Sequence, residues 1–172
     1  MTSSPVAFKS VFVTVGTTQF DKLITKISEK KVLHELKKKG CEKLILQIGR
    51  GEIEPPSDSQ VPGLEIEYFR FKPDISGDIN SADLVISHAG AGSCLETLGA
   101  GKCMLVVIND DLMNNHQTEL AHQLYKDGHL TYCTCSSLEE TLQTLDFSNI
   151  EPFPPAETAK FAEFLDRVVG FS

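Results

Sequence analysis

Apolar residues follow two alternating patterns along this chain: short unbroken runs, and longer stretches with helical spacing. The unbroken runs are rich in β-branched residues and predict buried strands over Ser10–Val15, Lys43–Ile48, Asp83–Ser87, Cys103–Ile108 and Leu130–Thr134. Leu64–Phe71 instead alternates apolar and polar residues, which predicts a strand with one solvated face near the edge of a sheet. The sequence therefore predicts six strands.

Helical spacing fills most of the segments between these strands. Helices are predicted from Phe20 to a stop at Gly40, over Pro73–Ser81, from about Ser93 to Gly99, over Asn115–Asp127, around Leu138 and Leu142 extending to Leu145, and as an amphipathic C-terminal helix over residues 156–170. Strands that alternate with helices predict an α/β fold with a doubly wound, mainly parallel sheet. We expect residues 1–172 to form a single domain.

Composition and charge narrow the classes of partner. The 172 residues hold 16 Lys and Arg against 24 Asp and Glu, a formal net charge of −8, which argues against nucleic acid or an anionic membrane surface as the partner. The longest apolar run, Cys103–Ile108, is far too short to span a bilayer. The N-terminus lacks the apolar centre of a secretory signal, so we expect a cytoplasmic protein whose five cysteines are reduced.

The turns that follow strands are the places to look for a site, because ligands of doubly wound sheets bind at the carboxyl ends of the strands. Gly16, Thr17 and Thr18 directly follow the first strand. Their backbone N–H groups and hydroxyls are suited to a phosphate oxygen. The alternative is that Gly16 only makes the turn and a threonine caps the next helix.

A second turn, from Ser87 to Ser93, opens the helix that carries Glu96. Gly90 and Gly92 expose several backbone donors at a helix start, which suits a diphosphate, and Glu96 could accept hydrogen bonds from ribose hydroxyls. Leu95 occupies the position of the third glycine in a dinucleotide fingerprint, so NAD is disfavoured. The alternative gives the glycines a turning role and Glu96 a favourable interaction with the helix dipole.

A third turn runs from Asn109 to Gln117 and combines amide side chains with an imidazole at a helix start. Such groups both donate and accept, as a polyhydroxylated sugar requires, although an asparagine cap with solvated neighbours is the alternative. Asp110 and Asp111 lack the partner cluster that a metal site needs, so neither a metal nor a cofactor is expected.

Together these turns resemble a known family. Four segments are closely similar to the cytosolic catalytic subunits of eukaryotic two-subunit UDP-N-acetylglucosamine transferases. They begin at Val11, Leu44, Asp83 and Leu112 and read V-F-V-T-V-G-T-T-Q-F-D-K-L-I, L-I-L-Q-I-G-R-G, D-L-V-I-S-H-A-G-A-G-S-C-L-E and L-M-N-N-H-Q. A more distant similarity is to the C-terminal half of the bacterial transferase that completes the lipid-linked peptidoglycan precursor. The resemblance implies the Rossmann-like, donor-binding C-terminal half of a GT-B glycosyltransferase.

The resemblance also implies the activity and the partner. The enzyme family moves GlcNAc from UDP-GlcNAc to dolichol-diphosphate-GlcNAc with inversion, and a separate membrane-anchored subunit binds the lipid-linked acceptor. That subunit recruits the soluble one to the cytosolic face of the endoplasmic reticulum. We expect the 156–170 helix to contribute to this docking.

Residue roles follow from the same resemblance. The donor-binding set it implies is Gly16, Thr17, Thr18, His88, Gly90, Ala91, Gly92, Ser93, Glu96, Asn115, His116 and Gln117. Arg50 is a further candidate for the nucleotide, with a solvent-facing loop arginine as the alternative. His88 and His116 are weak candidates for the general base, which we expect the partner to supply. The functional alternatives are a non-catalytic UDP-sugar-binding regulatory module and a fragment of a UDP-sugar epimerase or hydrolase.

Overall fold

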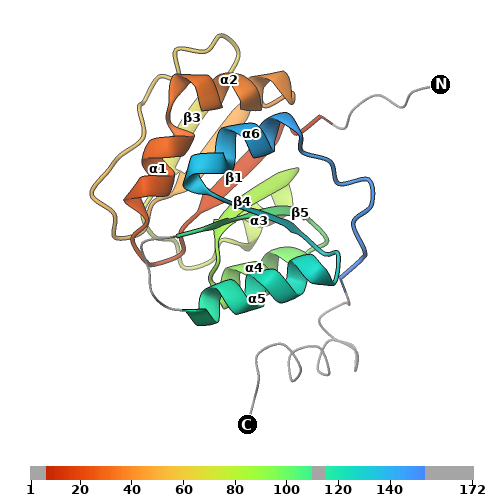
Figure 1. The fold of residues 1–172 in the computed structure, drawn as a ribbon. Coiled ribbons are helices and arrows are strands. Elements are labelled where there is room, and N and C mark those ends of the chain that lie inside the picture. The colour runs from red at the N-terminus through yellow and green to blue at the C-terminus, as the bar shows by residue number, and fades with distance from the viewer. Residues whose placement is uncertain (1–6, 110–114, 154–172) are drawn as a thin grey trace, which may run out of the picture.

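Six parallel strands form one sheet at the centre of the molecule (Figure 1). The computed structural model describes residues 7–109 and 115–153. The strands are β1 (Ser10–Thr14), β2 (Lys43–Gln47), β3 (Glu65–Phe69), β4 (Leu84–His88), β5 (Cys103–Ile108) and β6 (Thr131–Thr134). Their order is β3-β2-β1-β4-β5-β6, and every neighbouring pair is parallel. This order confirms the predicted doubly wound sheet, places β3 at an edge, and reverses direction between β1 and β4.

Helices cover both faces of the sheet (Figure 1). One face carries α1 (Asp21–Ile27), α2 (Lys30–Lys38), the short 3-10 helix η1 (Cys135–Ser137) and α6 (Leu138–Gln143); the other carries α3 (Ser76–Ser81), α4 (Ala91–Gly99) and α5 (Asn115–Lys126). Side chains that alternate along a strand divide between the two layers. In β1, Val11 and Val13 pack with α1 and α2, whereas Phe12 packs with α3.

The single helix predicted between Phe20 and Gly40 is wrong, because the structure divides it into α1 and α2. Glu29 has an extended backbone at the junction, with φ −64° and ψ 137°. Continuing the apolar stripe of α1 past Ile27 would bring lysines toward the core, whereas the next apolar side chains are Val32 and Leu33. The break changes the helical phase so that both stripes are buried.

The ends of the predicted elements also shift. The edge strand begins and ends inside Leu64–Phe71, and Leu145 follows the end of α6. The C-terminal helix expected over residues 156–170 lies outside the described residues, and a single domain over residues 1–172 stays a prediction. Within the described ranges, no helix combines the length and apolarity needed to cross a bilayer. All five cysteines are free thiols, as predicted, and only Cys103 is not fully buried.

A buried polar pair joins the carboxyl ends of β1 and β2. The Thr14 hydroxyl donates to Gln47 Oε1 over 2.6 Å and accepts from the Gly16 N–H over 2.9 Å. Thr14 and Gln47 are 0% and 3% exposed, so water cannot replace these bonds. Because Gly16 begins the first turn, the Thr14–Gln47 pair holds the start of this turn in place.

We predict that Thr14→Val lowers the free energy of unfolding by about 1–3 kcal/mol, because the isosteric side chain leaves the buried Gln47 Oε1 and the partly buried Gly16 N–H without their hydroxyl partner. Urea denaturation measures the change. Thr144→Val is the matched control, since that exposed hydroxyl bonds only to neighbouring carbonyls of its own helix. Equal effects in the two variants would contradict a supporting role for Thr14.

Candidate functional site

The turn after β1 is tight, and one of its own side chains stabilises it through a hydrogen bond to the backbone. Gly16 has φ +63°, a left-handed backbone that favours glycine. The Thr18 hydroxyl and N–H both donate to the Val15 carbonyl, over 2.7 and 3.3 Å. Thr17 is exposed and forms no hydrogen bond with another described residue. Thr18 therefore holds the turn in shape, while Thr17 faces outward.

His88, at the end of β4, lies between the two glycine turns. A Cβ added at Gly16 would come within 3.0 Å of His88 Nε2, and one added at Gly90 would overlap the imidazole ring. Ser93, in the first turn of α4, places its hydroxyl 3.4 Å from the same Nε2. The structure thus brings together Gly16, His88, Gly90 and Ser93 from the two turns that the sequence singled out.

Burial fixes the charge state of this imidazole. It lowers the pKa of His88 from 6.5 to about 4, so the ring is neutral at physiological pH. A neutral imidazole donates from one nitrogen and accepts at the other. With so low a pKa it is a weak base, which favours a binding role over a proton-abstracting one.

The N-terminus of α4 faces the same edge of the sheet. Gly90 caps this helix without a side-chain hydrogen bond, so no side chain caps the N–H groups of the first turn. A Cβ at Gly92 would meet nothing within 4 Å, so the glycine keeps the space outside the helix start open. Glu96 lies one turn further on and is also exposed. These features suit an anion with a polar extension along the helix.

The third predicted turn is only partly described. β5 lies beside β4 in the sheet, so the start of α5 lies at the same carboxyl edge as the start of α4. Asn115, His116 and Gln117 form the first residues of α5, but their side chains lie outside the described structure, as do residues 110–114. Their contact with a sugar therefore stays a prediction.

Two residues that the sequence reasoning missed organise this edge on its other side. Asp21, the first residue of α1, accepts hydrogen bonds from the backbone N–H groups of Glu52 and Ile53, each over 3.3 Å. Arg70, just after β3, donates to the carbonyls of Gly49 and Gly51. An acidic helix start and a strand-end arginine are common features, so the sequence held no signal for these contacts.

Three of the other histidines lie away from the site. His34 and His122 belong to α2 and α5, and His129 precedes β6 at the amino edge of the sheet. Across residues 7–109 and 115–153, no three His, Cys, Asp or Glu side chains gather closely enough to hold a metal ion. The described part of the chain therefore offers backbone and neutral donors at the carboxyl edge rather than a cluster of metal ligands.

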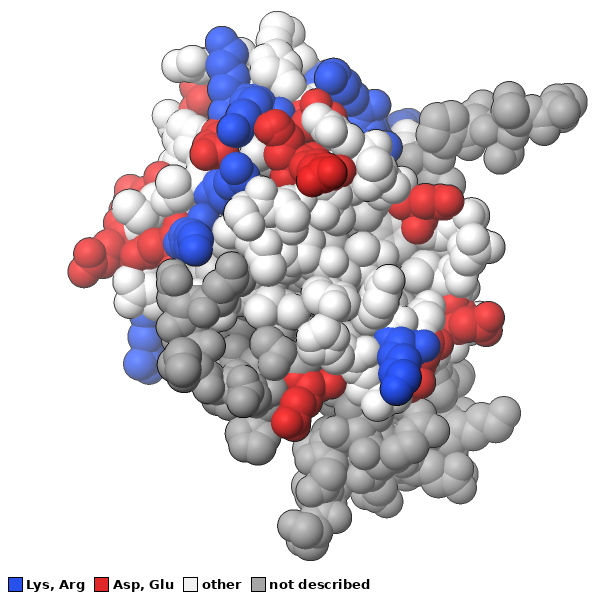
Figure 2. All heavy atoms as spheres, viewed as in Figure 1, with Lys and Arg blue, Asp and Glu red and all other residues white. Residues whose placement is uncertain are grey.

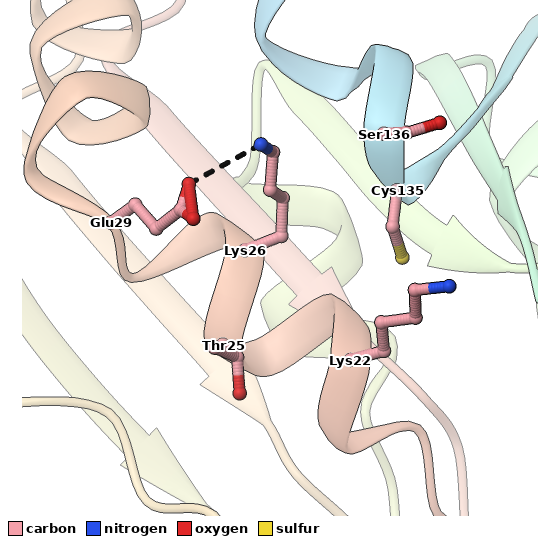
Figure 3. A pocket seen from close by; sticks show the side chains of 6 residues that line it. All are labelled: Lys22, Thr25, Lys26, Glu29, Cys135 and Ser136. Atoms are coloured by element: carbon pink, nitrogen blue, oxygen red, sulfur yellow. Dashed lines mark ion pairs between the residues drawn. The ribbon is translucent and has the colours of Figure 1, made fainter.

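A separate hollow of about 400 Å³ lies between α1 and η1, lined by Lys22, Thr25, Lys26, Glu29, Cys135 and Ser136. Figure 3 shows the Lys22 and Cys135 side chains pointing into it, and Lys26 forming an ion pair with Glu29 over 3.3 Å. None of the predicted site residues lines it. On the face drawn in Figure 2, charges of both signs mix over the described helices instead of forming a continuous basic surface.

We predict that His88 makes the fold acid-sensitive. The unfolded chain binds a proton near pH 6.5 and the folded chain only near pH 4, so stability falls as pH drops through this window. Between pH 7 and 5 the wild-type free energy of unfolding should fall by about 2 kcal/mol more than that of His88→Asn. Denaturant titrations at both pH values measure this. The exposed His34→Asn control should keep the wild-type slope, and an equal slope in His88→Asn would contradict the prediction.

Comparison with known sequences places the chain among glycosyltransferases. Residues 10–168 match the glycosyltransferase family 28 C-terminal domain. The chain is similar to UDP-N-acetylglucosamine transferase subunit ALG13 of Homo sapiens, with 56% identity over 130 residues, which are 76% of this chain and 11% of the human protein. The protein of the same name in Yarrowia lipolytica is 38% identical over 162 residues, covering 92% of this chain and 83% of that protein. The chain thus spans about a tenth of the human relative and most of the yeast one.

Solved structures agree with this placement. An NMR structure of ALG13 matches with a TM-score of 0.70 and 27% identity, covering 98% of this chain and all of that one. The crystal structure of Acinetobacter baumannii MurG shares the fold at 22% identity, with a TM-score of 0.61 over 84% of this chain and 41% of MurG. From its sequence, its sheet and these relatives, the chain belongs to the glycosyltransferase family 28 C-terminal domain family, among the ALG13-type UDP-N-acetylglucosamine transferase subunits.

Proposed function

We propose that this chain is the donor-binding catalytic subunit of an inverting N-acetylglucosaminyltransferase that moves GlcNAc from UDP-GlcNAc to dolichol-diphosphate-GlcNAc. The observation that carries this proposal is the convergence of Gly16, His88 and Gly90 at the start of α4, where the strand order reverses. Relatives named UDP-N-acetylglucosamine transferase subunits support the choice of donor.

The donor extends along the carboxyl edge in this proposal. The Thr17 N–H and the backbone N–H groups of residues 90–93 hold the diphosphate, and the neutral His88 imidazole donates to it. Glu96 accepts from the ribose hydroxyls, since it lies one turn along α4 from these donors. Residues 115–117 contact the GlcNAc from the start of α5.

The reaction is a single displacement. The acceptor hydroxyl attacks the anomeric carbon, the bond from that carbon to the UDP oxygen breaks, and the configuration inverts. Donors at the helix start and the two turns stabilise the charge that develops on the departing diphosphate. The low pKa of His88 makes it unsuited to accept the proton of the acceptor hydroxyl, so we assign the general base to the partner.

The partner in this proposal is a membrane-anchored subunit that binds the lipid-linked acceptor. It recruits this chain from the cytoplasm to the cytosolic face of the endoplasmic reticulum. Two features support a partner: the relatives are named subunits, and the family model describes a C-terminal domain. The carboxyl edge is where the acceptor-binding half would close over the donor.

The decisive test measures transfer from UDP-GlcNAc to a lipid-diphosphate-GlcNAc acceptor with the chain alone, the partner alone and both together. We expect transfer only with both, and weak binding of UDP by the isolated chain in a chelator, as measured by calorimetry. UDP binding without transfer by the complex would favour a regulatory module. Binding that appears only after Mg²⁺ or Mn²⁺ is restored would contradict the metal-free donor site.

We further predict that Glu96→Ala and Gln117→Ala each reduce kcat/KM for UDP-GlcNAc by about 5- to 150-fold, equivalent to 1–3 kcal/mol of transition-state binding, because a polar group of the donor loses its partner. Both folds should survive, because Glu96 is exposed and Gln117 lies at a helix start. Glu140→Ala, at an exposed position of α6, is the control and should keep wild-type kinetics. Full activity in either site variant would remove that residue from the donor site.

A further inference from the structure

We propose that Arg50 provides the positive charge that stabilises the departing diphosphate, and that Asp21 and Arg70 are positioning residues that hold the backbone on both sides of Arg50. This inference rests on the proposed transferase function. It assigns a role to the loop after β2, residues 49–54, which we call the arginine loop.

The arginine loop packs directly against the turn after β1. The Arg50 N–H donates to the Thr18 carbonyl over 3.0 Å. Gly49 has φ +58°, and a Cβ there would overlap the same carbonyl oxygen. A Cβ at Gly51 would overlap the Asp21 carboxylate. Gly49 therefore allows a close approach to the turn that no other residue permits, and Gly51 leaves room for the Asp21 carboxylate.

Asp21 fastens the far side of the arginine loop. Its two carboxylate oxygens accept the N–H groups of Glu52 and Ile53, and one of them also accepts from the Gln19 amide over 2.8 Å. Desolvation alone would raise the pKa of Asp21, but these hydrogen bonds and the Arg70 charge hold it below its ordinary value. The carboxylate is thus ionised at neutral pH, and it accepts N–H groups from a loop about 30 positions away in sequence.

Arg70, which follows the end of β3, binds the same loop through hydrogen bonds. Its Nη1 donates to the Gly49 carbonyl over 3.2 Å and to the Gly51 carbonyl over 2.5 Å, so it bridges the residues on either side of Arg50. Its Nη2 lies 3.5 Å from Glu54 Oε1, and the Tyr68 hydroxyl donates to the other oxygen of Glu54 over 2.9 Å. The ends of β1, β2 and β3 are thereby joined through the arginine loop.

These contacts fix the backbone of Arg50 and leave its side chain available. The side chain is exposed, and its guanidinium forms no hydrogen bond or ion pair with residues 7–109 or 115–153. Although the chain has a net charge of −8, no carboxylate of the described residues pairs with Arg50, so its charge is available beside the proposed phosphate-binding turn. Guanidinium groups bind phosphate oxygens through two parallel hydrogen bonds, and a fixed cation stabilises charge that develops on a leaving group.

The test compares kcat and KM for UDP-GlcNAc in the complex of the full chain with its membrane partner. Arg50→Ala should lower kcat by about 100-fold, the scale for removing one donor from a developing oxyanion, and Arg50→Lys should fall between this variant and wild type. Asp21→Ala should also lower kcat, by a smaller factor than Arg50→Ala. In the Arg50→Ala background, Asp21→Ala should cause less than about a twofold further loss, because it acts through Arg50.

Controls separate this inference from the proposed function and from simple destabilisation. Asp146→Ala removes another exposed aspartate that accepts a backbone N–H, from Ser148 over 2.9 Å, and should keep wild-type kinetics. Asp21→Asn, which keeps one acceptor oxygen, replaces Asp21→Ala if that variant does not fold. Absence of transfer by the wild-type complex would defeat the proposed function. Wild-type kcat in Arg50→Ala would overturn the inference with that function intact, and losses that multiply in the double variant would overturn the positioning role of Asp21.

Discussion

The close approach of β1 and β4 at their carboxyl ends is the constraint on which the rest of the structure depends. β1 pairs with β2 on one side and β4 on the other, so the chain leaves these strands toward opposite faces of the sheet. The His88 imidazole fills the space between the two departing turns, and only glycine at positions 16 and 90 leaves room for it. Glycine at position 90 also leaves the N–H groups at the start of α4 without a side-chain cap, so the packing of His88 and the openness of this helix start have one cause.

The sequence predicted the sheet well because each strand carries its own signal. The runs of β1, β2, β4 and β5 are apolar on both faces, as strands covered by two helical layers must be, and the alternation of β3 reflects its single covered face. The glycine turns were also visible, since Gly16 and Gly90 each lie close behind a strand. The division of the first helix into α1 and α2 was missed. It depends on how the apolar side chains of each helix are oriented toward the sheet, and residue spacing alone indicates this orientation only weakly.

Contacts between distant segments account for what remained hidden in the candidate site. Asp21 and Arg70 are unremarkable in the sequence, and their importance arises only when β1, β2 and β3 align and bring a carboxylate and a guanidinium to either side of the arginine loop. His88 was visible as a candidate site residue, but its low pKa follows from burial in the folded chain. The sequence pattern thus predicted which turns lie close together, and the structure added the hydrogen bonds and packing contacts that hold these turns in place.

The hydrogen bonds between Asp21 and the arginine loop limit which substitutions this loop can accept. Asp21 contacts residues 52 and 53 only through their N–H groups, so their side chains are not specified by the contact. Both positions should therefore drift in composition among descendants of this sequence, with proline excluded because it has no N–H to give. The surface that residues 52 and 53 present beside the site is accordingly free to adapt to a changing neighbour while the backbone beneath it stays the same.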